Sequence, residues 1–333
     1  MMKLSTMKKV VATVNDEWQS PVAEKILERW GYDHDSVYYF RSSANFVFVF
    51  HKEGKKHFLR FSDSCERKLQ TIEAEIEILH YLRDQPIHTA QPVPSLNNKY
   101  IEVVETEIGT FYAVVFEALQ GEQYDIEDIN EEHYFVWGRT LGQLHANLKR
   151  MPETYRRGRP SWQEQLNSVN TMLTTQEPFV QKEWELVTKW AEQKLVSEQT
   201  FGLIHYDFEL DNLCWQNEKV SILDFDDCVN HWYVADIAYS LRELSEYDVD
   251  LENQFVQAFI RGYTQETELD MSLLKDLKWF MRMHNIVTFA TLLRTVDIQE
   301  SPDDPEWLIH LREDLLGYIE EYRASFKKRV TEN

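Results

Sequence analysis

Short runs of hydrophobic and aromatic residues in the first third of the chain predict strands. VYYF (37–40), FVFVF (46–50) and HFLRF (57–61) are rich in β-branched and aromatic residues, and the turn-like segments RSSAN and HKEGKK separate them. This pattern predicts a three-stranded antiparallel meander. YIEVV and FYAVVFEAL, with a turn around Gly109 between them, predict two further strands. Residues 16–30 resemble a short helix with Pro21 in its first turn.

A helical period interrupts this run of strands at residues 66–83. Leu69, Ile72, Ile76, Leu79 and Leu82 recur at steps of three and four, which predicts an amphipathic helix. Glu75 falls on the same face as these apolar residues. A carboxylate on an apolar face needs a partner, and we expect one on a neighbouring strand.

From Asn130 onward the pattern is mainly helical, except for short strand-like runs within residues 201–225. Five amphipathic stretches are HYFVWGRTLGQLHANL, EPFVQKEWELVTKWAEQKL, LENQFVQAFIRGY, LLKDLKWFMRMHNIVTFATLLRT and PEWLIHLREDLLGYIEEYRASF. The change of pattern divides the chain near residue 120. The sequence therefore predicts an α+β protein with a sheet-rich lobe at 1–119 and a larger, mainly helical lobe at 120–333.

Charge and cysteine content narrow the class of protein. The chain has 333 residues, with 35 Lys and Arg against 57 Asp and Glu, a formal charge of −22. Such a chain repels nucleic acid and anionic lipid, so neither is expected as a partner. Cys65, Cys214 and Cys228 do not form the close pairs of a disulfide framework. Without a signal peptide or a membrane-length apolar run, we expect a cytoplasmic protein; the sequence gives no oligomeric state.

Candidate chemistry lies in HYDFELDN (205–212), which precedes two short strands. LCW, the turn-like QNEK, VSIL and DFDD follow in order. Antiparallel pairing of LCW with VSIL brings Asn212 beside Asp224, and Asp207 lies one short loop away. The alternative is a polar loop whose acids simply face water.

One amide and two carboxylates at the mouth of a hairpin suit Mg²⁺, which prefers oxygen ligands and substrate phosphates. Asn212 and Asp224 are the expected metal ligands, and Asp207 is the expected acceptor of a proton from a hydroxyl group. His205, Asp207 and Asn212 have the spacing of a phosphoryl-transfer loop, and Asp224 begins its metal motif. His205 is expected to hold the loop by a hydrogen bond. Glu209 and Asp211 are expected to face solvent, or alternatively a substrate.

IHYDFELDNLCW, followed by VSILDFDDCVNHWYVADIAYSL, resembles the aminoglycoside phosphotransferase and choline kinase-like group of the protein-kinase-like fold. Homoserine kinase-like and stress-response kinase-like proteins share this layout. The usual motif is His-Gly-Asp-x-His-x-x-Asn, from which Tyr206 and Glu209 depart, and a later Asp-Leu-Ala corresponds to Asp236-Ile237-Ala238. The resemblance extends over about residues 35–325. It implies a bilobal fold, with nucleotide binding in 1–119 and catalysis and substrate binding in 120–333.

The resemblance also implies nucleotide-binding residues in the first lobe. RSSAN would cover the ATP phosphates with Ser42, Ser43 and Asn45; a plain hairpin turn is the alternative. FEAL (116–119) would be the hinge whose backbone binds adenine, around Glu117 and Leu119.

Further residues are implied by the same motifs. Arg60 occupies the place of the usual phosphate-binding Lys, and Glu75 would be its partner; the alternative is an ordinary edge-strand Arg. Asp236 would accept backbone hydrogen bonds from the catalytic loop. His145 is expected to be a packed structural histidine.

Together these residues imply an ATP- and Mg²⁺-dependent phosphotransferase. The acceptor would be a hydroxyl of a small molecule: an amino alcohol, a homoserine-like compound, or an aminoglycoside or other sugar. The alternatives are a serine/threonine protein kinase of the stress-response type and a catalytically weak nucleotide-binding regulator. A metallohydrolase is disfavoured because His205 and His231 lack the spacing of a ligand pair. CVNHWYV, Arg282, His284 and Asn285 either line the acceptor pocket or pack in the core.

Overall fold

The computed structural model describes residues 1–173, 177–217, 219–244 and 249–331. Their contacts form two compact units. Unit 1 comprises Met1–Ile76, Gln91–Ala118 and Thr288–Asn333, and unit 2 comprises Glu77–Ala90 and Leu119–Val287. The predicted functional division at residue 119 remains a prediction, because grouping by contacts assigns no function to either unit.

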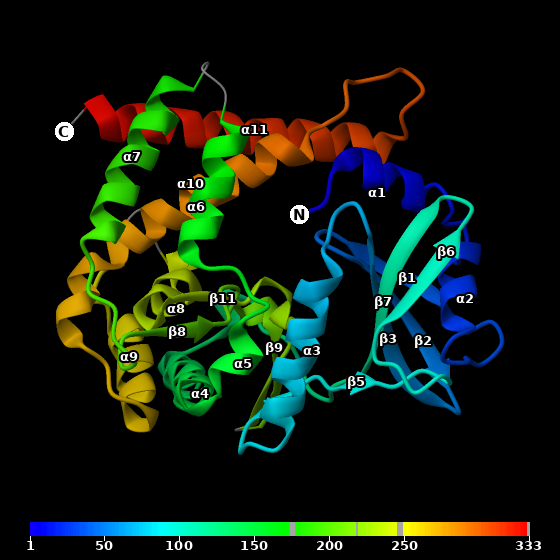
Figure 1. The fold of residues 1–333 in the computed structure, drawn as a ribbon, viewed down its shortest axis with the longest axis horizontal. Helices are drawn as coiled ribbons and strands as arrows, with labels where there is room; N and C mark the ends of the chain where they lie inside the picture. The colour runs from blue at the N-terminus through cyan, green and yellow to red at the C-terminus, as the bar shows by residue number, and fades with distance from the viewer. Residues whose placement is uncertain (174–176, 218, 245–248, 332–333) are drawn as a thin grey trace. The chain divides into compact units, whose positions relative to one another are not determined.

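Unit 1 is built on a six-stranded antiparallel sheet in the order β1-β2-β3-β7-β5, with β6 also paired to β7. Its strands are β1 (Tyr38–Ser42), β2 (Phe46–Lys52), β3 (Lys55–Asp63), β5 (Pro92–Val93), β6 (Glu102–Thr106) and β7 (Gly109–Glu117). The predicted meander and the two later strands are therefore present (Figure 1).

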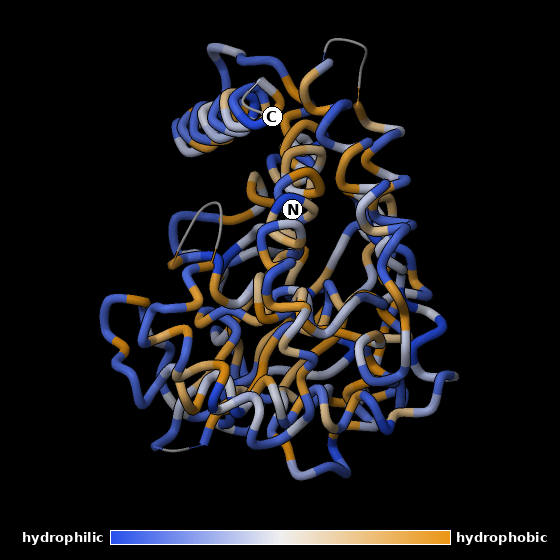
Figure 2. Tube along the Cα trace, turned by 90° about the vertical axis from the view of Figure 1, so that its left-hand side faces the viewer, coloured by the Kyte–Doolittle hydropathy of each residue, from blue (hydrophilic) through white to orange (hydrophobic). Residues whose placement is uncertain are grey.

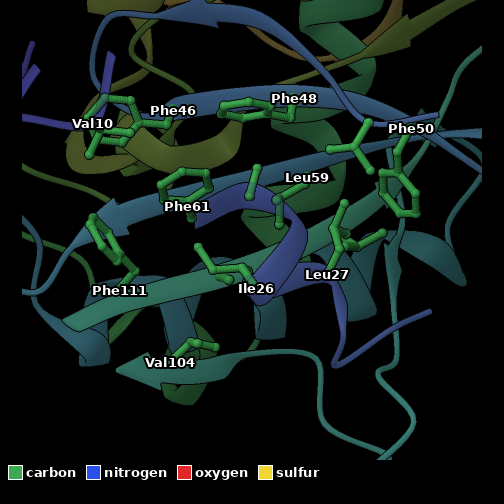
Figure 3. Packing of buried hydrophobic residues seen from close by; sticks show 14 of the residues in the cluster. Val10, Ile26, Leu27, Phe46, Phe48, Phe50, Leu59, Phe61, Val104 and Phe111 are labelled. Atoms are coloured by element: carbon green, nitrogen blue, oxygen red, sulfur yellow. The ribbon is translucent and has the colours of Figure 1, made fainter. Parts of the chain in front are cut away.

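One face of this sheet forms an aromatic core. Phe46, Phe48 and Phe50 alternate along β2 and are fully buried, as period-2 alternation on a half-buried strand requires. Figure 3 shows them packed with Phe61 of β3 and Phe111 of β7. Ring centroids of Phe48 and Phe61 lie 5.7 Å apart.

Two short N-terminal helices cover that core. α1 (Leu4–Val11) adds Val10, and α2 (Pro21–Leu27) adds Ile26 and Leu27 (Figure 3). The predicted helix at 16–30 is present but shorter, and Pro21 stands at its start as expected. The sequence analysis did not predict α1.

The opposite face of the sheet contacts helix α3 (Leu69–Arg83). Ile72 and Ile76 pack on Val114, whose side chain points away from those of its neighbours Ala113 and Val115. The predicted periodicity of this helix thus corresponds to a real buried face.

The C-terminal residues pack against the N-terminal part of unit 1. α11 (Glu306–Thr331) contacts α1, and Figure 2 shows both hydrophilic and hydrophobic residues on this last helix, beside the mark for the C-terminus. Lys8 pairs with Asp304 at 2.6 Å. Arg294, near the end of α10 (Leu277–Thr295), pairs with Glu66 at 2.6 Å.

Unit 2 is mainly helical and carries two small sheets. Its helices are the end of α3 from Glu77, α4 (Glu131–Arg150), α5 (Glu153–Arg156), α6 (Trp162–Met172), α7 (Pro178–Glu192), α8 (Tyr233–Ser240), α9 (Gln254–Glu266) and α10 up to Val287. One sheet joins β4 (His88–Thr89), β10 (Lys219–Ile222) and β9 (Leu213–Gln216), and the other joins β11 (Val229–Trp232) to β8 (Phe201–Ile204). Glycines let α4 and α9 pack backbone to backbone: a Cβ at Gly138 would lie 1.9 Å from the carbonyl oxygen of Phe259.

The helices that the structure describes include none with the combined length and hydropathy of a membrane span.

Candidate active site

The hairpin of β9 and β10 positions the candidate metal ligands. Leu213 pairs with Ile222, and the N–H of Leu223 donates to the carbonyl of Asn212 at 2.8 Å. Asn212 therefore lies beside the end of β10, where Asp224 follows. This is the arrangement that the spacing predicted. Glu218, within the expected QNEK turn, lies outside the described residues.

Asn212 also contacts the candidate base directly. Its amide nitrogen donates to the backbone carbonyl and to the carboxylate Oδ2 of Asp207, both at 2.9 Å. The amide nitrogen of Asn212 is therefore fully used in hydrogen bonds to Asp207. The amide oxygen has no hydrogen-bond partner among the described residues. A hard cation favours such an oxygen together with a carboxylate, so Asn212 and Asp224 fit the metal that the motif implies. No cluster of three or more His, Cys, Asp or Glu suited to a metal occurs in the described part of the chain.

Asp224 has an unusual backbone conformation. Its φ of 55° and ψ of 72° are left-handed, immediately before the 3₁₀ turn Phe225–Asp227. A non-glycine residue in this region costs about 1–3 kcal/mol, and such strain concentrates at functional sites.

His205 ties the catalytic loop to the hairpin. Its Nε2 is 2.9 Å from the carbonyl oxygen of Leu223, and its ring lies edge-on to Phe225 at 4.7 Å between centroids. The predicted structural role of His205 is therefore confirmed.

Asp236 clamps the backbone of the same loop. Its carboxylate accepts the N–H of His205 at 2.8 Å and the N–H of Tyr206 at 2.7 Å. His145 donates from Nε2 to Asp236 at 3.0 Å and accepts at Nδ1 from the Tyr263 hydroxyl at 2.8 Å. Burial lowers the pKa of His145 although Asp236 opposes the shift. The expected supporting roles of Asp236 and His145 are both confirmed.

Arg242 is the residue of this region that the sequence analysis missed. Its Nη2 lies 3.4 Å from Asp207 Oδ1 and forms an ion pair with Glu209. Its Nη1 lies 3.3 Å from His284 Nε2. Burial, and then the charge of Arg242, lower the pKa of His284 well below 6.5, so the neutral ring accepts this hydrogen bond. Glu209, only 16% exposed, thus faces Arg242 and not solvent.

The pocket-lining role of the late helix remains a prediction, and core packing accounts for two of its three named residues. His284 faces Arg242. Arg282, however, binds both oxygens of buried Glu183 at 2.7 Å and lies over Trp279. Arg282 therefore packs in the core, and Asn285 is also buried.

In unit 1, Arg60 and Glu75 form the predicted ion pair. Their side chains are 10% and 0% exposed, and the Arg60 guanidinium lies 4.9 Å from the centroid of the Phe116 ring. The pair forms because Arg60 of β3 points to the face of the sheet on which α3 packs, and Glu75 lies on the side of α3 that is turned to this face. A role of Arg60 in phosphate binding remains a prediction.

The other expected nucleotide-binding residues occupy a hairpin turn and a strand end. Asn45 is buried and accepts from Ser62 at 2.5 Å, while Ser42 ends β1 and Ser43 follows it. Glu117 ends β7, where its N–H donates to the carbonyl of Gln91 at 3.1 Å. Leu119 begins the second segment of unit 2. Contact of these residues with a nucleotide remains a prediction.

Glu75→Gln should destabilise the protein by about 3 kcal/mol, because it leaves the Arg60 charge buried without its counter-charge. Urea unfolding measures this change. The matched control is Glu73→Gln on the exposed face of α3, expected within about 0.5 kcal/mol of wild type. Equal stabilities of the two variants would contradict the pairing.

The buried histidines of unit 2 predict a pH dependence of stability. Burial lowers the pKa of His231 from 6.5 to about 3. Burial also lowers the pKa values of His145 and His284. Below pH 6.5 the unfolded chain binds protons that the folded chain does not, so stability decreases as pH falls. For His231 alone the loss between pH 7.5 and 5.5 totals about 1.4 kcal/mol, because the unfolded histidine takes up its proton only around and below pH 6.5. Urea titrations at pH 7.5 and 5.5 measure it, and His231→Gln should reduce the difference; an unchanged difference would contradict the assignment.

The site and the fold define a class of protein. The phosphotransferase enzyme family matches residues 37–274, well over half of the chain, and the chain belongs to this family. It is a kinase with the α+β protein-kinase-like fold.

Particular relatives are similar over nearly the whole chain. Amicoumacin kinase of Bacillus subtilis (strain 168) is 26% identical over 313 residues, 89% of this chain and 92% of that protein. The structure of amicoumacin kinase hAmiN with AMP-PNP, Ca²⁺ and Ami has a TM-score of 0.79 and 22% identity, covering 97% of this chain and 96% of that one. The microcompartment-associated aminopropanol kinase has a TM-score of 0.69 and 18% identity, covering 93% and 97%. Spectinomycin phosphotransferase has a TM-score of 0.62 and 14% identity, covering 90% and 93%.

Proposed function

We propose that this kinase transfers the γ-phosphate of ATP, bound with Mg²⁺, to a hydroxyl of a small molecule that carries an amino group. The observation that carries the proposal is the contact of Asn212 with Asp207 at the mouth of the β9–β10 hairpin, where Asp224 follows. Membership of the phosphotransferase family and the AMP-PNP and Ca²⁺ in the hAmiN structure support it.

Each proposed residue has a distinct task. Asp207 accepts the proton of the acceptor hydroxyl, whose oxygen forms a bond to the γ-phosphorus as the bond to the β–γ bridging oxygen breaks. ADP leaves with the electron pair of that bond, and Asp207 returns its proton to water. Asn212 and Asp224 would hold the divalent ion, which would neutralise phosphate charge when bound. Arg60, held by Glu75, contributes charge to the α- and β-phosphates.

A group of carboxylates in unit 2 favours a cationic acceptor. Partial desolvation raises the pKa of Glu243, the positive charge of Arg242 opposes this shift, and the negative charges of Asp211, Glu127 and Asp125 add to it. Among the described residues these four acids outnumber the one cation that acts on Glu243, and the group lies beside the catalytic loop because Asp211 is part of that loop. An ammonium group relieves such repulsion. Aminopropanol and spectinomycin, which appear in the names of two structural relatives, both carry amino groups that suit a negative region.

The experiment is an acceptor panel with purified protein, ATP and Mg²⁺, with ADP release as the readout. The panel holds an aminopropanol, ethanolamine, homoserine, spectinomycin and amicoumacin, and Asp207→Asn is the inactive control. We expect at least one acceptor to stimulate ADP release in the wild type but not in the control. Nucleotide binding without turnover on any acceptor would favour a regulator. Phosphate on a protein serine would favour a protein kinase, and either result would overturn the proposal.

A further inference from the structure

Tyr206 has a backbone conformation that its side chain disfavours. Its φ is 76°, in the left-handed region, where bulky residues are rare. The conformation aims its N–H at Asp236, 2.7 Å away, so the clamp on the catalytic loop imposes it. Glycine adopts this conformation without strain, yet the chain places an aromatic residue here, directly before Asp207. Strain that is retained beside a reacting group suggests a use for the side chain.

The Tyr206 ring joins an aromatic group with Tyr239 and His284. Its centroid lies 5.1 Å from that of Tyr239 and 5.7 Å from that of His284. Tyr239 is fully buried, whereas Tyr206 is only partly buried. Tyr206 therefore packs on other aromatic rings while the residue as a whole keeps partial exposure.

This aromatic group lies on one side of the candidate base. Asp207 Oδ2 accepts from Asn212 on the side of the metal ligands. Oδ1 faces Arg242, which contacts His284, and His284 contacts the Tyr206 ring. A hydroxyl that gives its proton to Oδ1 would lie on the side of Asp207 where Arg242, His284 and Tyr206 are. The rest of the acceptor molecule would then be close to the Tyr206 ring.

We propose that Tyr206 is a specificity-determining residue: its ring is the wall on which the carbon skeleton of the acceptor packs while the hydroxyl reaches Asp207. This inference rests on the proposed function. Such a wall favours acceptors that have an apolar face next to the reactive hydroxyl, because an apolar face packs well on an aromatic ring. It also gives a reason for a tyrosine where the usual motif has glycine.

The test compares Tyr206→Phe with two variants that lack the ring, Tyr206→Asn and Tyr206→Gly. Asn and Gly tolerate the left-handed backbone, and Phe keeps the ring but loses the hydroxyl. With the best acceptor of the panel, we expect the acceptor KM to rise about 10- to 100-fold in both ring-less variants. The acceptor KM of Tyr206→Phe and the KM for ATP in all three should stay within about twofold of wild type. Melting temperatures of all variants show whether each is folded.

An unchanged acceptor KM in a folded ring-less variant would overturn the inference. Equal increases in the KM for acceptor and for ATP would also overturn it, because they indicate a general structural role. These outcomes are distinct from failure of the proposed function. If turnover depends on Asp207 but the acceptor KM does not change with substitution of Tyr206, only this inference fails. If no acceptor supports Asp207-dependent turnover, both this inference and the proposed function fail.

Discussion

Replacing Asp224 by Ala should lower phosphoryl transfer by about a thousandfold or more, because the nucleotide phosphates lose their divalent ion at the moment of charge transfer. Asp224 follows β10 beside Asn212, so the end of the hairpin places its carboxylate next to the Asn212 amide. The same variant should lose the part of the ATP-induced thermal stabilisation that depends on Mg²⁺. Thermal shift with ATP, with and without Mg²⁺, and steady-state turnover measure the two effects.

Asp224→Asn controls for backbone strain in this experiment. Asn tolerates the left-handed conformation of position 224 better than Ala does, so it separates loss of charge from local misfolding. Both variants should lose turnover, and both should keep the ATP shift seen without metal. A variant that keeps the full Mg²⁺-dependent shift would contradict the assignment of Asp224 as a metal ligand.

Replacing Asp207 by Asn should lower kcat by about a thousandfold while nucleotide binding stays close to wild type, since removal of a general base typically costs 10²–10⁴. The variant should fold, because Asn can still accept from Asn212 and because Arg242 keeps its pair with Glu209. Steady-state kinetics and the Mg²⁺-dependent thermal shift by ATP separate the two properties. Turnover equal to that of the wild type would exclude Asp207 as the proton acceptor.

Local features of this site were predictable from the sequence. The hairpin that places Asn212 beside Asp224 follows from two strand-like runs and a short turn, and strand pairing then fixes the register. The period of one helix put Glu75 on an apolar face, where a carboxylate needs a partner, and the family resemblance named Arg60 as that partner. Both arrangements are present.

Features set by distant segments were not predictable. Arg242 reaches Asp207 from a 3₁₀ turn after α8, and no spacing rule points from one to the other. Asn45 belongs to a turn whose sequence is polar, which predicts an exposed side chain. The Asn45 side chain is nevertheless buried, and it accepts a hydrogen bond from Ser62 on the neighbouring strand. The positive φ of Tyr206 arises from the Asp236 clamp, which a residue thirty positions along the chain supplies.

The C-terminal residues show a similar limit. Their apolar period predicts helices, but a period does not state which core the helix covers. The sequence pattern placed them with the second lobe, whereas the contacts of Thr288–Asn333 group them with unit 1. Ion pairs of Lys8 with Asp304 and of Arg294 with Glu66 hold them there, and each links residues more than two hundred positions apart.

The most direct test of the central claim follows the γ-phosphate itself. Wild type and Asp207→Asn are incubated with ATP, Mg²⁺ and the best acceptor of the panel, and the phosphorus-containing products are identified by ³¹P NMR and mass spectrometry. A phosphotransferase of the proposed kind gives ADP and phosphorylated acceptor in equal amounts with the wild type and neither with the variant. Inorganic phosphate or phosphorylated protein as the main product, with the acceptor unchanged, would contradict it.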